Sequence, residues 1–381
     1  MLCITNGDVI LEREIVHKNV YMDGETIVKI SDEAPSVHDQ VIDAKGRYVS
    51  PGFIDVHTHG RKGCDTMDGD VEKLKVISKE NLTTGCTSYL PTTMTMQKED
   101  VNKAIDAVAA LKGNEPGAKI LGVHMEGPFV SEKYKGAQDA KNIIPSTVEN
   151  FQALAHGHED LIRKITLAPE SAGALDLIAY LAKQGISVSV GHSNATYDEA
   201  IAAFDAGANS TTHTYNAMTP LDKRKPGIVG AVMDDPRPYA ELILDGKHVY
   251  YPAARILLKM VGKERLILIT DSLECTGMPL GQYELGGQPI WVEEGRAVLK
   301  DGTIAGSIAG MNEVVRHAFE HLNVSLPEAV NFASRNPAKS IHEEHLGLIR
   351  EGYKADLILF DDQIDVSMAI VRGQIKYNKG E

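Results

Sequence analysis

The sequence predicts an α/β protein with a (β/α)8 barrel of the TIM type and a small β-sandwich domain built from both chain termini. Between residues 50 and 345, apolar stretches alternate with amphipathic helical stretches, which is typical of parallel βα units. Eight such apolar stretches can be counted, and eight units close a barrel. The two ends of the chain instead carry short apolar runs separated by glycine turns.

The repeating units are placed as follows. The predicted strands lie at 52–56, 87–91, 120–125, 165–168, 187–190, 210–212, 240–244 and 266–270. Helices are predicted at 71–84, 101–111, 174–184 and 197–206, several of them ending near a glycine such as Gly85 or Gly207. The glycine-rich segment 277–302 predicts a small β insertion after the eighth strand.

Residues 1–49 show no helical pattern. Their turn pairs Asn6-Gly7, Asp23-Gly24 and Lys45-Gly46 predict β-hairpins. The segment 346–381 repeats this pattern around Gly352 and Gly373. We therefore expect 1–49 and 346–381 to form one small β domain, with 50–345 as the barrel.

Composition narrows the class of protein. Of 381 residues, 43% are hydrophobic and 24% charged, the balance of a folded chain with a core. A formal charge of -14 argues against nucleic acid as a partner, although a local cationic pocket could still bind a small anion. Four scattered cysteines without a CxxC pair predict neither disulfides nor a cysteine zinc site. We find no signal-peptide pattern or membrane-length apolar run, so we expect a cytoplasmic protein with no membrane contact.

Metal-ligand residue types follow the predicted strands, at the end of the barrel where active sites form. They are His57 and His59 after the first strand, Glu126 after the third, His192 after the fifth, His213 after the sixth and Asp271 after the eighth. Residues i and i+2 of a strand share a face, so both first-strand histidines can reach the barrel mouth. Imidazole and carboxylate ligands suit zinc and iron, and there are enough here for two ions.

Asp271 is the candidate general base. A metal lowers the pKa of bound water from 15.7 toward about 7, and a neighbouring carboxylate can then take its proton and return it to a leaving amine. The alternative is that Asp271 caps a helix.

Two other histidine pairs serve as comparisons. His156 and His158 lie in a polar stretch that follows no strand, so we expect them at the surface. His317 and His321 have i,i+4 spacing but lack the glutamate directly after the first histidine that the zinc-protease motif requires. They predict a half-buried helix face.

Longer motifs resemble a known family. SPGFIDVHTHG at 50–60 and EGYKADL at 351–357 resemble the amidohydrolase superfamily. Within it, the chain resembles the N-acetylglucosamine-6-phosphate deacetylases over essentially its whole length. The motifs are HMEGPF at 124–129, LAPE at 167–170, GHSNAT at 191–196, THTYNAM at 212–218 and DGKH at 245–248. The resemblance implies hydrolysis of the sugar's acetamide to D-glucosamine 6-phosphate and acetate, in amino-sugar catabolism and recycling.

The resemblance also implies residue roles. Glu126, His192 and His213 would hold the principal divalent ion, His57 and His59 a second, with Zn²⁺ or Fe²⁺ expected, and Asp271 would be the acid-base. The substrate would be held by Gly127, Asn216, Ala217 and His248, and by Arg224, which in a homodimer completes the neighbouring subunit's site. Gln138 occupies a position where the family often carries a histidine near the acetyl group.

Two further substrate contacts follow from the residues themselves. The loop 221–227 is locally cationic in an acidic protein and follows strand six, which favours phosphate binding over a solvated turn. Ser307, Ile308 and Ala309 open a helix, where free backbone N–H groups could hold substrate. Capping by Ser307 is the alternative.

Two other functions are weighed against deacetylation. A cyclic amidohydrolase of the dihydroorotase or hydantoinase kind would need a carboxylated lysine at the end of strand four, where Lys164 lies at the wrong end. A non-catalytic scaffold on the same barrel should have lost its ligands, yet the full set and Asp271 are present.

Overall fold

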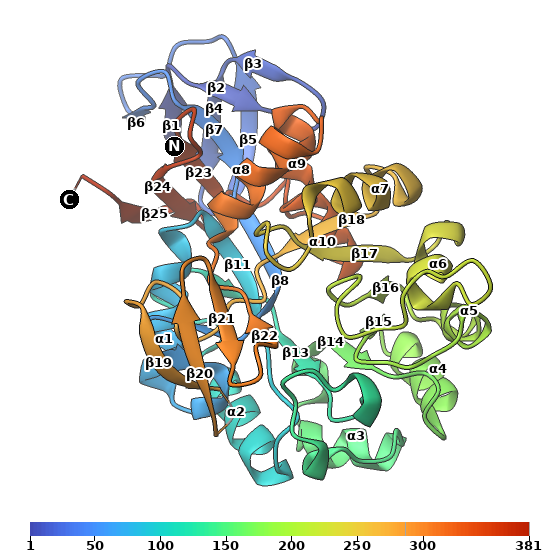
Figure 1. Cartoon of the computed structure of the whole chain (residues 1–381). Helices are drawn as coiled ribbons and strands as arrows, with labels where there is room; N and C mark the ends of the chain where they lie inside the picture. The colour runs from blue at the N-terminus through green and yellow to red at the C-terminus, as the bar shows by residue number, and fades with distance from the viewer. Residues whose placement is uncertain (286, 381) are drawn as a thin grey trace.

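The computed structural model describes residues 1–285 and 287–380, and it combines a parallel barrel with two mixed sheets formed by the chain ends (Figure 1). The barrel strands are β8 (Phe53–Thr58), β11 (Cys86–Pro91), β12 (Lys119–Ile120), β13 (Val123–Glu126), β14 (Ile162–Leu167), β15 (Ser187–Val190), β16 (Ser210–Thr211), β17 (Tyr239–Ile243) and β18 (Leu266–Ile269). All eight predicted strands are confirmed, the third being divided into β12 and β13.

The strands follow one another in chain order around the barrel. One sheet runs β8, β11, β12 and the other runs from β13 to β18, all parallel. A parallel bridge between Thr92 and His124 joins the two sheets on one side. On the other, the Asp271 N–H donates to the His57 carbonyl at 2.9 Å. The ring therefore closes between the first and eighth strands, where two predicted site residues lie.

Helices cover the outside of the barrel (Figure 1). They are α1 (Val71–Leu82), α2 (Lys98–Leu111), α3 (Val148–Ala155), α4 (Ala174–Lys183), α5 (Tyr197–Ala206), α6 (Gly227–Asp234), α7 (Tyr251–Val261), α8 (Met311–His321), α9 (Leu326–Phe332) and α10 (Arg335–Ser340). Helix α5 has the start and stop residues that are typical of helices. It begins with a capping box of Thr196 and Glu199, and it ends at Gly207, whose φ is 117°. No helix within 1–285 or 287–380 is long and apolar enough to cross a bilayer.

The glycine-rich segment after the eighth strand forms the predicted β insertion. It is an antiparallel sheet of β19 (Gly281–Leu285), β20 (Gln288–Glu293), β21 (Arg296–Leu299) and β22 (Ile304–Gly306). Two shorter strands, β9 (Gly60–Arg61) and β10 (Cys64–Asp65), pair just beyond β8.

Strands from both chain ends share one sheet. It has the order β25 (Gln374–Asn378), β24 (Val366–Val371), β23 (Leu357–Phe360), β7 (Tyr48–Pro51), β2 (Asp8–Ile10) and β3 (Ile15–His17). A second sheet contains β5 (Thr26–Ser31), β4 (Asn19–Asp23), β1 (Leu2–Thr5) and β6 (Gln40–Asp43). Residues from the two sheets, among them Ile4, Val20, Val49 and Leu357, form a common buried cluster. A β-sandwich is thus built from both termini.

The N-terminal turns correct one expectation. Asp23-Gly24 joins an antiparallel pair, β4 and β5, as predicted. The hairpins predicted at Asn6-Gly7 and Lys45-Gly46 are wrong, because these turns carry the chain from one sheet to the other, between β1 and β2 and between β6 and β7. Two sheets can cover each other only if the chain crosses between them, which a local turn signal does not reveal.

The sandwich and the barrel are joined at Gly52, the one residue between β7 and β8. A Cβ there would lie 2.0 Å from Thr87 Oγ1, so only glycine fits between the strands. Beside it, Phe53 of β8 packs against Phe360 of β23 with ring centroids 6.4 Å apart. The strand β8, which carries His57 and ends one residue before His59, is therefore anchored to the terminal sheet.

Phe53→Ala tests this anchor. Both rings are fully buried, so we expect the free energy of unfolding to fall by about 3–5 kcal/mol, the usual cost of removing a buried aromatic ring. Urea unfolding of the metal-free protein measures the loss, with Val37→Ala, at a 95% exposed position, as the control. A loss no greater than that of the control would contradict the anchor.

Candidate metal centre and active site

The six predicted metal and acid-base residues come together at the barrel mouth as two groups of three. One group contains His57, His59 and Asp271; the other contains Glu126, His192 and His213. Within each group the candidate ligand atoms all lie within 4.8 Å of one another, and all six side chains are buried. Asp271, expected as a base alone, also lies among the potential ligands of the first group.

Backbone conformation directs three of these side chains. His192, His213 and Asp271 follow β15, β16 and β18, and have positive φ values of 47°, 29° and 49°. Residues other than glycine adopt this region rarely and at a cost, which is typical of functional sites. The chain thus turns sharply where each strand ends, and the side chains point into the mouth. No helix among the described residues begins at Asp271, so the alternative of a helix cap is wrong.

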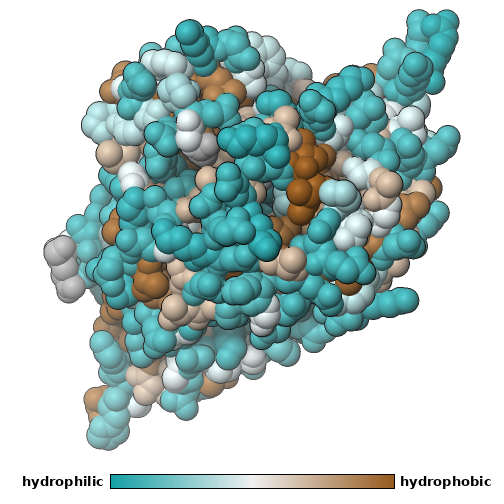
Figure 2. All heavy atoms as spheres, turned by 90° about the horizontal axis from the view of Figure 1, so that it is seen from below, coloured by the Kyte–Doolittle hydropathy of each residue, from teal (hydrophilic) through white to brown (hydrophobic). Residues whose placement is uncertain are grey.

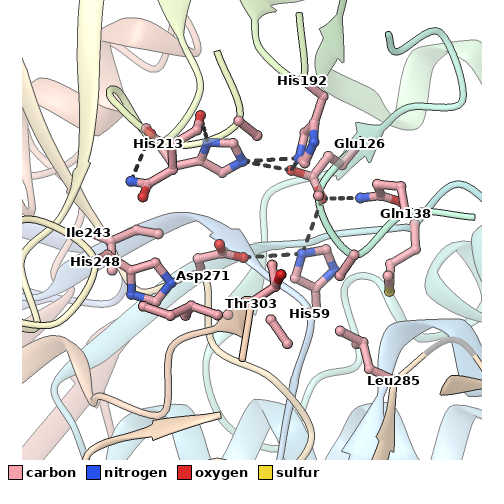
Figure 3. Close-up of a pocket in the computed structure, with 18 of the residues that line it drawn as sticks. His59, Glu126, Gln138, His192, His213, Ile243, His248, Asp271, Leu285 and Thr303 are labelled. Carbon is pink, nitrogen blue, oxygen red and sulfur yellow. Dashed lines mark hydrogen bonds and ion pairs between the residues drawn. The ribbon is translucent and has the colours of Figure 1, made fainter. Parts of the chain in front are cut away.

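Glu126 stands between the two groups (Figure 3). Its Oε1 is 3.2 Å from His192 Nε2, 3.4 Å from His213 Nε2 and 3.2 Å from His57 Nε2. Its Oε2 is 3.3 Å from His59 Nε2. One carboxylate therefore faces four imidazoles, drawn from both groups.

The donor set fits divalent cations. His57 Nδ1 and Nε2 and His59 Nδ1 are buried without a hydrogen-bond partner, an arrangement that is costly unless another ligand satisfies them. In the second group, the Nδ1 atoms of His192 and His213 lie 3.0 and 3.1 Å from the carbonyls of Tyr134 and Asn216. An Nδ1–H donated to a carbonyl leaves Nε2 free to bind a metal. The two Nε2 atoms are 3.1 Å apart and face the same point.

Opposite charges shift the pKa values of the first group. Burial opposes protonation of His57, but the Glu126 and Asp271 carboxylates raise its pKa to about 9. Burial also opposes ionisation of Asp271, yet its pKa is lowered, because the charge on His57 and the hydrogen bond to His59 stabilise the carboxylate. Asp271 is thus held as an anion, the form a general base needs.

A buried ion pair beneath the site was not predicted from the sequence. Lys164 of β14 and Glu241 of β17 pair directly, and both side chains are only 1% exposed. Glu241 Oε2 lies 3.6 Å from His57 Nδ1 and accepts the backbone N–H of His213 at 3.4 Å. Charged residues are almost never fully buried unless paired, so a glutamate inside one predicted apolar strand and a lysine directly before another were the available signal.

His124 is a second buried side chain to which the sequence assigned no role. Its Nε2 lies 2.8 Å from Thr166 Oγ1, and its ring packs edge-on against His57 with centroids 4.5 Å apart. It fills the space behind the first group.

A cavity of about 430 Å³ opens above the two groups (Figure 3). Four of the predicted substrate residues line it, namely Gln138, Asn216, Ala217 and His248. Lys133 adds a cation, and Leu285 and residues 303–306 of the β insertion form another part of its wall. The insertion therefore contributes directly to the cavity.

The other predicted substrate residues do not line this cavity. Gly127 lies next to Glu126, where a Cβ would come within 2.1 Å of Thr95 Oγ1. Arg224 is exposed in its loop. The prediction that Ser307, Ile308 and Ala309 open a helix is wrong, and so is capping by Ser307, because α8 begins at Met311 with Gly310 as its N-cap residue.

The four histidines of the two comparison pairs lie outside the two ligand groups. His156 is exposed at the end of α3, and His158 Nε2 is 3.1 Å from Asp106 Oδ1. His317 Nδ1 is 2.8 Å from the Leu244 carbonyl, and His321 stacks on Tyr251.

The fold and the paired ligand groups define a metal-dependent hydrolase, and the sequence profile of the amidohydrolase family matches residues 48–377. The chain belongs to this family. It is 38% identical to N-acetylglucosamine-6-phosphate deacetylase of Bacillus subtilis, over 99% of this chain and 97% of that one. It is 35% identical to N-acetylgalactosamine-6-phosphate deacetylase of Escherichia coli O157:H7, over 88% and 89%.

The fold is also similar to solved structures. N-acetylglucosamine-6-phosphate deacetylase from Pasteurella multocida superimposes with a TM-score of 0.93 at 33% identity, covering 99% of this chain and 100% of that one. D-hydantoinase from Bacillus sp. AR9 gives a TM-score of 0.64 at 15% identity, covering 99% and 95%, and this likeness shows the fold alone.

Metal binding to the first group should depend on pH. Below about pH 9, His57 holds a proton that a metal must displace, so the apparent affinity falls as the pH falls. We expect a decrease of up to about tenfold per pH unit for each proton released. Zinc titration of the metal-free protein, in buffers of different ionisation enthalpy, measures both affinity and proton release. An affinity that is constant from pH 6.5 to 9 would contradict the raised pKa.

Proposed function

We propose that the protein hydrolyses the acetamide of N-acetyl-D-glucosamine 6-phosphate to D-glucosamine 6-phosphate and acetate. The observation that carries the proposal is the convergence of two ligand groups, one of which includes Asp271, on one cavity, in a chain similar over almost its full length to deacetylases of amino-sugar phosphates. A mutant of the enzyme from Mycobacterium smegmatis, at 32% identity and a TM-score of 0.92, was crystallised with N-acetyl-D-glucosamine-6-phosphate.

We assign the steps of the reaction to the bound metal and to Asp271. A divalent metal, when bound by the two groups, acidifies water and polarises the acetamide carbonyl. Asp271 takes a proton from the attacking water as the new C–O bond forms. The same residue then gives that proton to the sugar nitrogen as the C–N bond breaks, so the amine leaves neutral. We expect one or two ions of Zn²⁺ or Fe²⁺, with Glu126, His192 and His213 holding the principal one.

Phosphate binding requires local positive charge, because the chain as a whole is acidic. His248 lines the cavity and faces Asp245, whose Oδ2 is 2.7 Å from His248 Nδ1 and orients the ring. Asn216 and Ala217 offer main-chain contacts to the sugar. Arg224 is exposed outside its own cavity, which supports a homodimer in which it reaches the neighbouring subunit's phosphate. We place the enzyme in the cytoplasm.

The cyclic amidohydrolase alternative has less support. A carboxylated lysine would require a free amine facing the ligand groups, whereas Lys164 is buried in its pair with Glu241. A scaffold function is also disfavoured, because all six ligand and acid-base residues are kept in position.

Asp271→Asn should abolish most turnover. The amide cannot accept the water proton, so we expect kcat for acetate release to fall about 10²–10⁴-fold with little change in KM. Metal content is measured in parallel, since Asp271 is also a potential ligand. Asp176→Asn, on the exposed face of α4, is the control. Wild-type turnover by Asp271→Asn, at equal metal content, would refute the assigned role.

Arg224→Ala and His248→Ala should weaken binding of the phosphate. We expect KM to rise at least about tenfold for N-acetylglucosamine 6-phosphate and to change little for N-acetylglucosamine, because only the first offers a charged partner. Lys183→Ala, at the exposed end of α4, is the matched control. Equal losses on the two substrates would exclude phosphate contacts.

A further inference from the structure

Gln138 makes two hydrogen bonds that fix its amide group. Its Oε1 accepts the backbone N–H of Thr95 at 2.7 Å, and its Nε2 donates to Glu126 Oε2 at 2.9 Å (Figure 3). A backbone N–H can only donate and a carboxylate can only accept, so both contacts require the same orientation of the amide. The side chain is 3% exposed, so water competes little for these bonds.

The loop that carries Gln138 also contacts the second ligand group. The carbonyl of Tyr134 lies 3.0 Å from His192 Nδ1, and the Ser131 N–H donates to the His192 carbonyl at 2.7 Å. Glu126 and His192 are therefore both held from outside by residues 131–138. This loop is a support for the metal ligands as well as part of the cavity wall.

The hydrogen bond from Gln138 acts on one particular oxygen. It occupies Oε2, the oxygen that faces His59 at 3.3 Å, whereas Oε1 faces His57 of the first group and His192 of the second, each at 3.2 Å. Rotation of the carboxylate would remove Oε2 from His59. The amide therefore keeps both oxygens of Glu126 directed at the ligand groups, and it does so without adding a charge to the site.

We propose that Gln138 is a positioning residue that holds Glu126 across the two ligand groups, so that the ion at His57, His59 and Asp271 depends on this hydrogen bond. The inference rests on the divalent metal of the proposed function, but not on the identity of the substrate. This role of Gln138 differs from a direct contact with the acetyl group of the substrate. A positioning role predicts an effect on metal binding even when no substrate is present.

Gln138→Met removes the donor and keeps the length of the side chain. The proposal requires that the wild type bind two zinc equivalents. The variant should bind one of them about 10–100-fold more weakly, the usual cost of removing a partner that orients a ligand. The other equivalent should change less than about threefold, because His192 and His213 keep their own partners. Equilibrium dialysis of the metal-free protein against chelator-buffered Zn²⁺, with metal analysis, measures both affinities.

A double-mutant cycle identifies the affected group. In a His59→Ala background, Gln138→Met should cause no further loss, because the ion that it supports is already destabilised. The matched control is Gln288→Met. The Gln288 Nε2 donates to the carbonyl of Ala137, next to Gln138 in the same loop, at 2.9 Å, and this hydrogen bond involves no carboxylate. The control variant should bind both equivalents as the wild type does.

Two results would overturn the proposal. One is wild-type affinity for both equivalents in Gln138→Met, whether or not KM for the substrate changes; the other is an undiminished loss in the His59→Ala background. If Gln138→Met does not fold, Gln138→Asn, which is too short to join Thr95 and Glu126, is subject to the same criteria. Because zinc binding is measured without substrate, a failure of acetate release by the wild type would be a separate result.

Discussion

Four imidazoles directed at one carboxylate are the interaction on which the rest of the site depends. Glu126 is buried among His57, His59, His192 and His213, each within 3.2 to 3.4 Å of one of its oxygens. Burying so many polar atoms is costly unless they are hydrogen-bonded, ion-paired or bound to a cation. A site for divalent metal is the arrangement that satisfies them all, and the surrounding structure serves to keep them apart and correctly oriented.

The barrel supplies that orientation through its backbone. Its strand ends converge at one mouth, and the positive φ values at His192, His213 and Asp271 turn the side chains inward. The closing hydrogen bond from Asp271 N–H to the His57 carbonyl ties Asp271 to the first barrel strand. The Lys164–Glu241 pair then fills the space below with charges that compensate each other. Strain and burial are thus concentrated where the chemistry requires fixed groups.

The cavity shows how an acidic protein can take an anionic substrate. The face shown in Figure 2 is covered mainly by hydrophilic residues, and the overall charge is -14. Positive charge is therefore needed locally, and Lys133 lies in the cavity wall itself. Parts of its wall come from the β insertion and from the loop around Gln138, and this loop also contacts Glu126 of the second ligand group.

The sequence by itself determined the repeating architecture and the six residues at the barrel mouth, because apolar periodicity is a local property and parallel strands place their carboxyl ends together. Only the tertiary structure decided which groups face each other. The turns at Asn6-Gly7 and Lys45-Gly46 look like hairpins locally, but they cross between sheets because the two sheets must cover a common core. Lys164 pairs with Glu241 across 77 positions, and Gln138 reaches Glu126 only through the path of its loop. Such contacts depend on distance in space, which residue type and spacing along the chain do not specify.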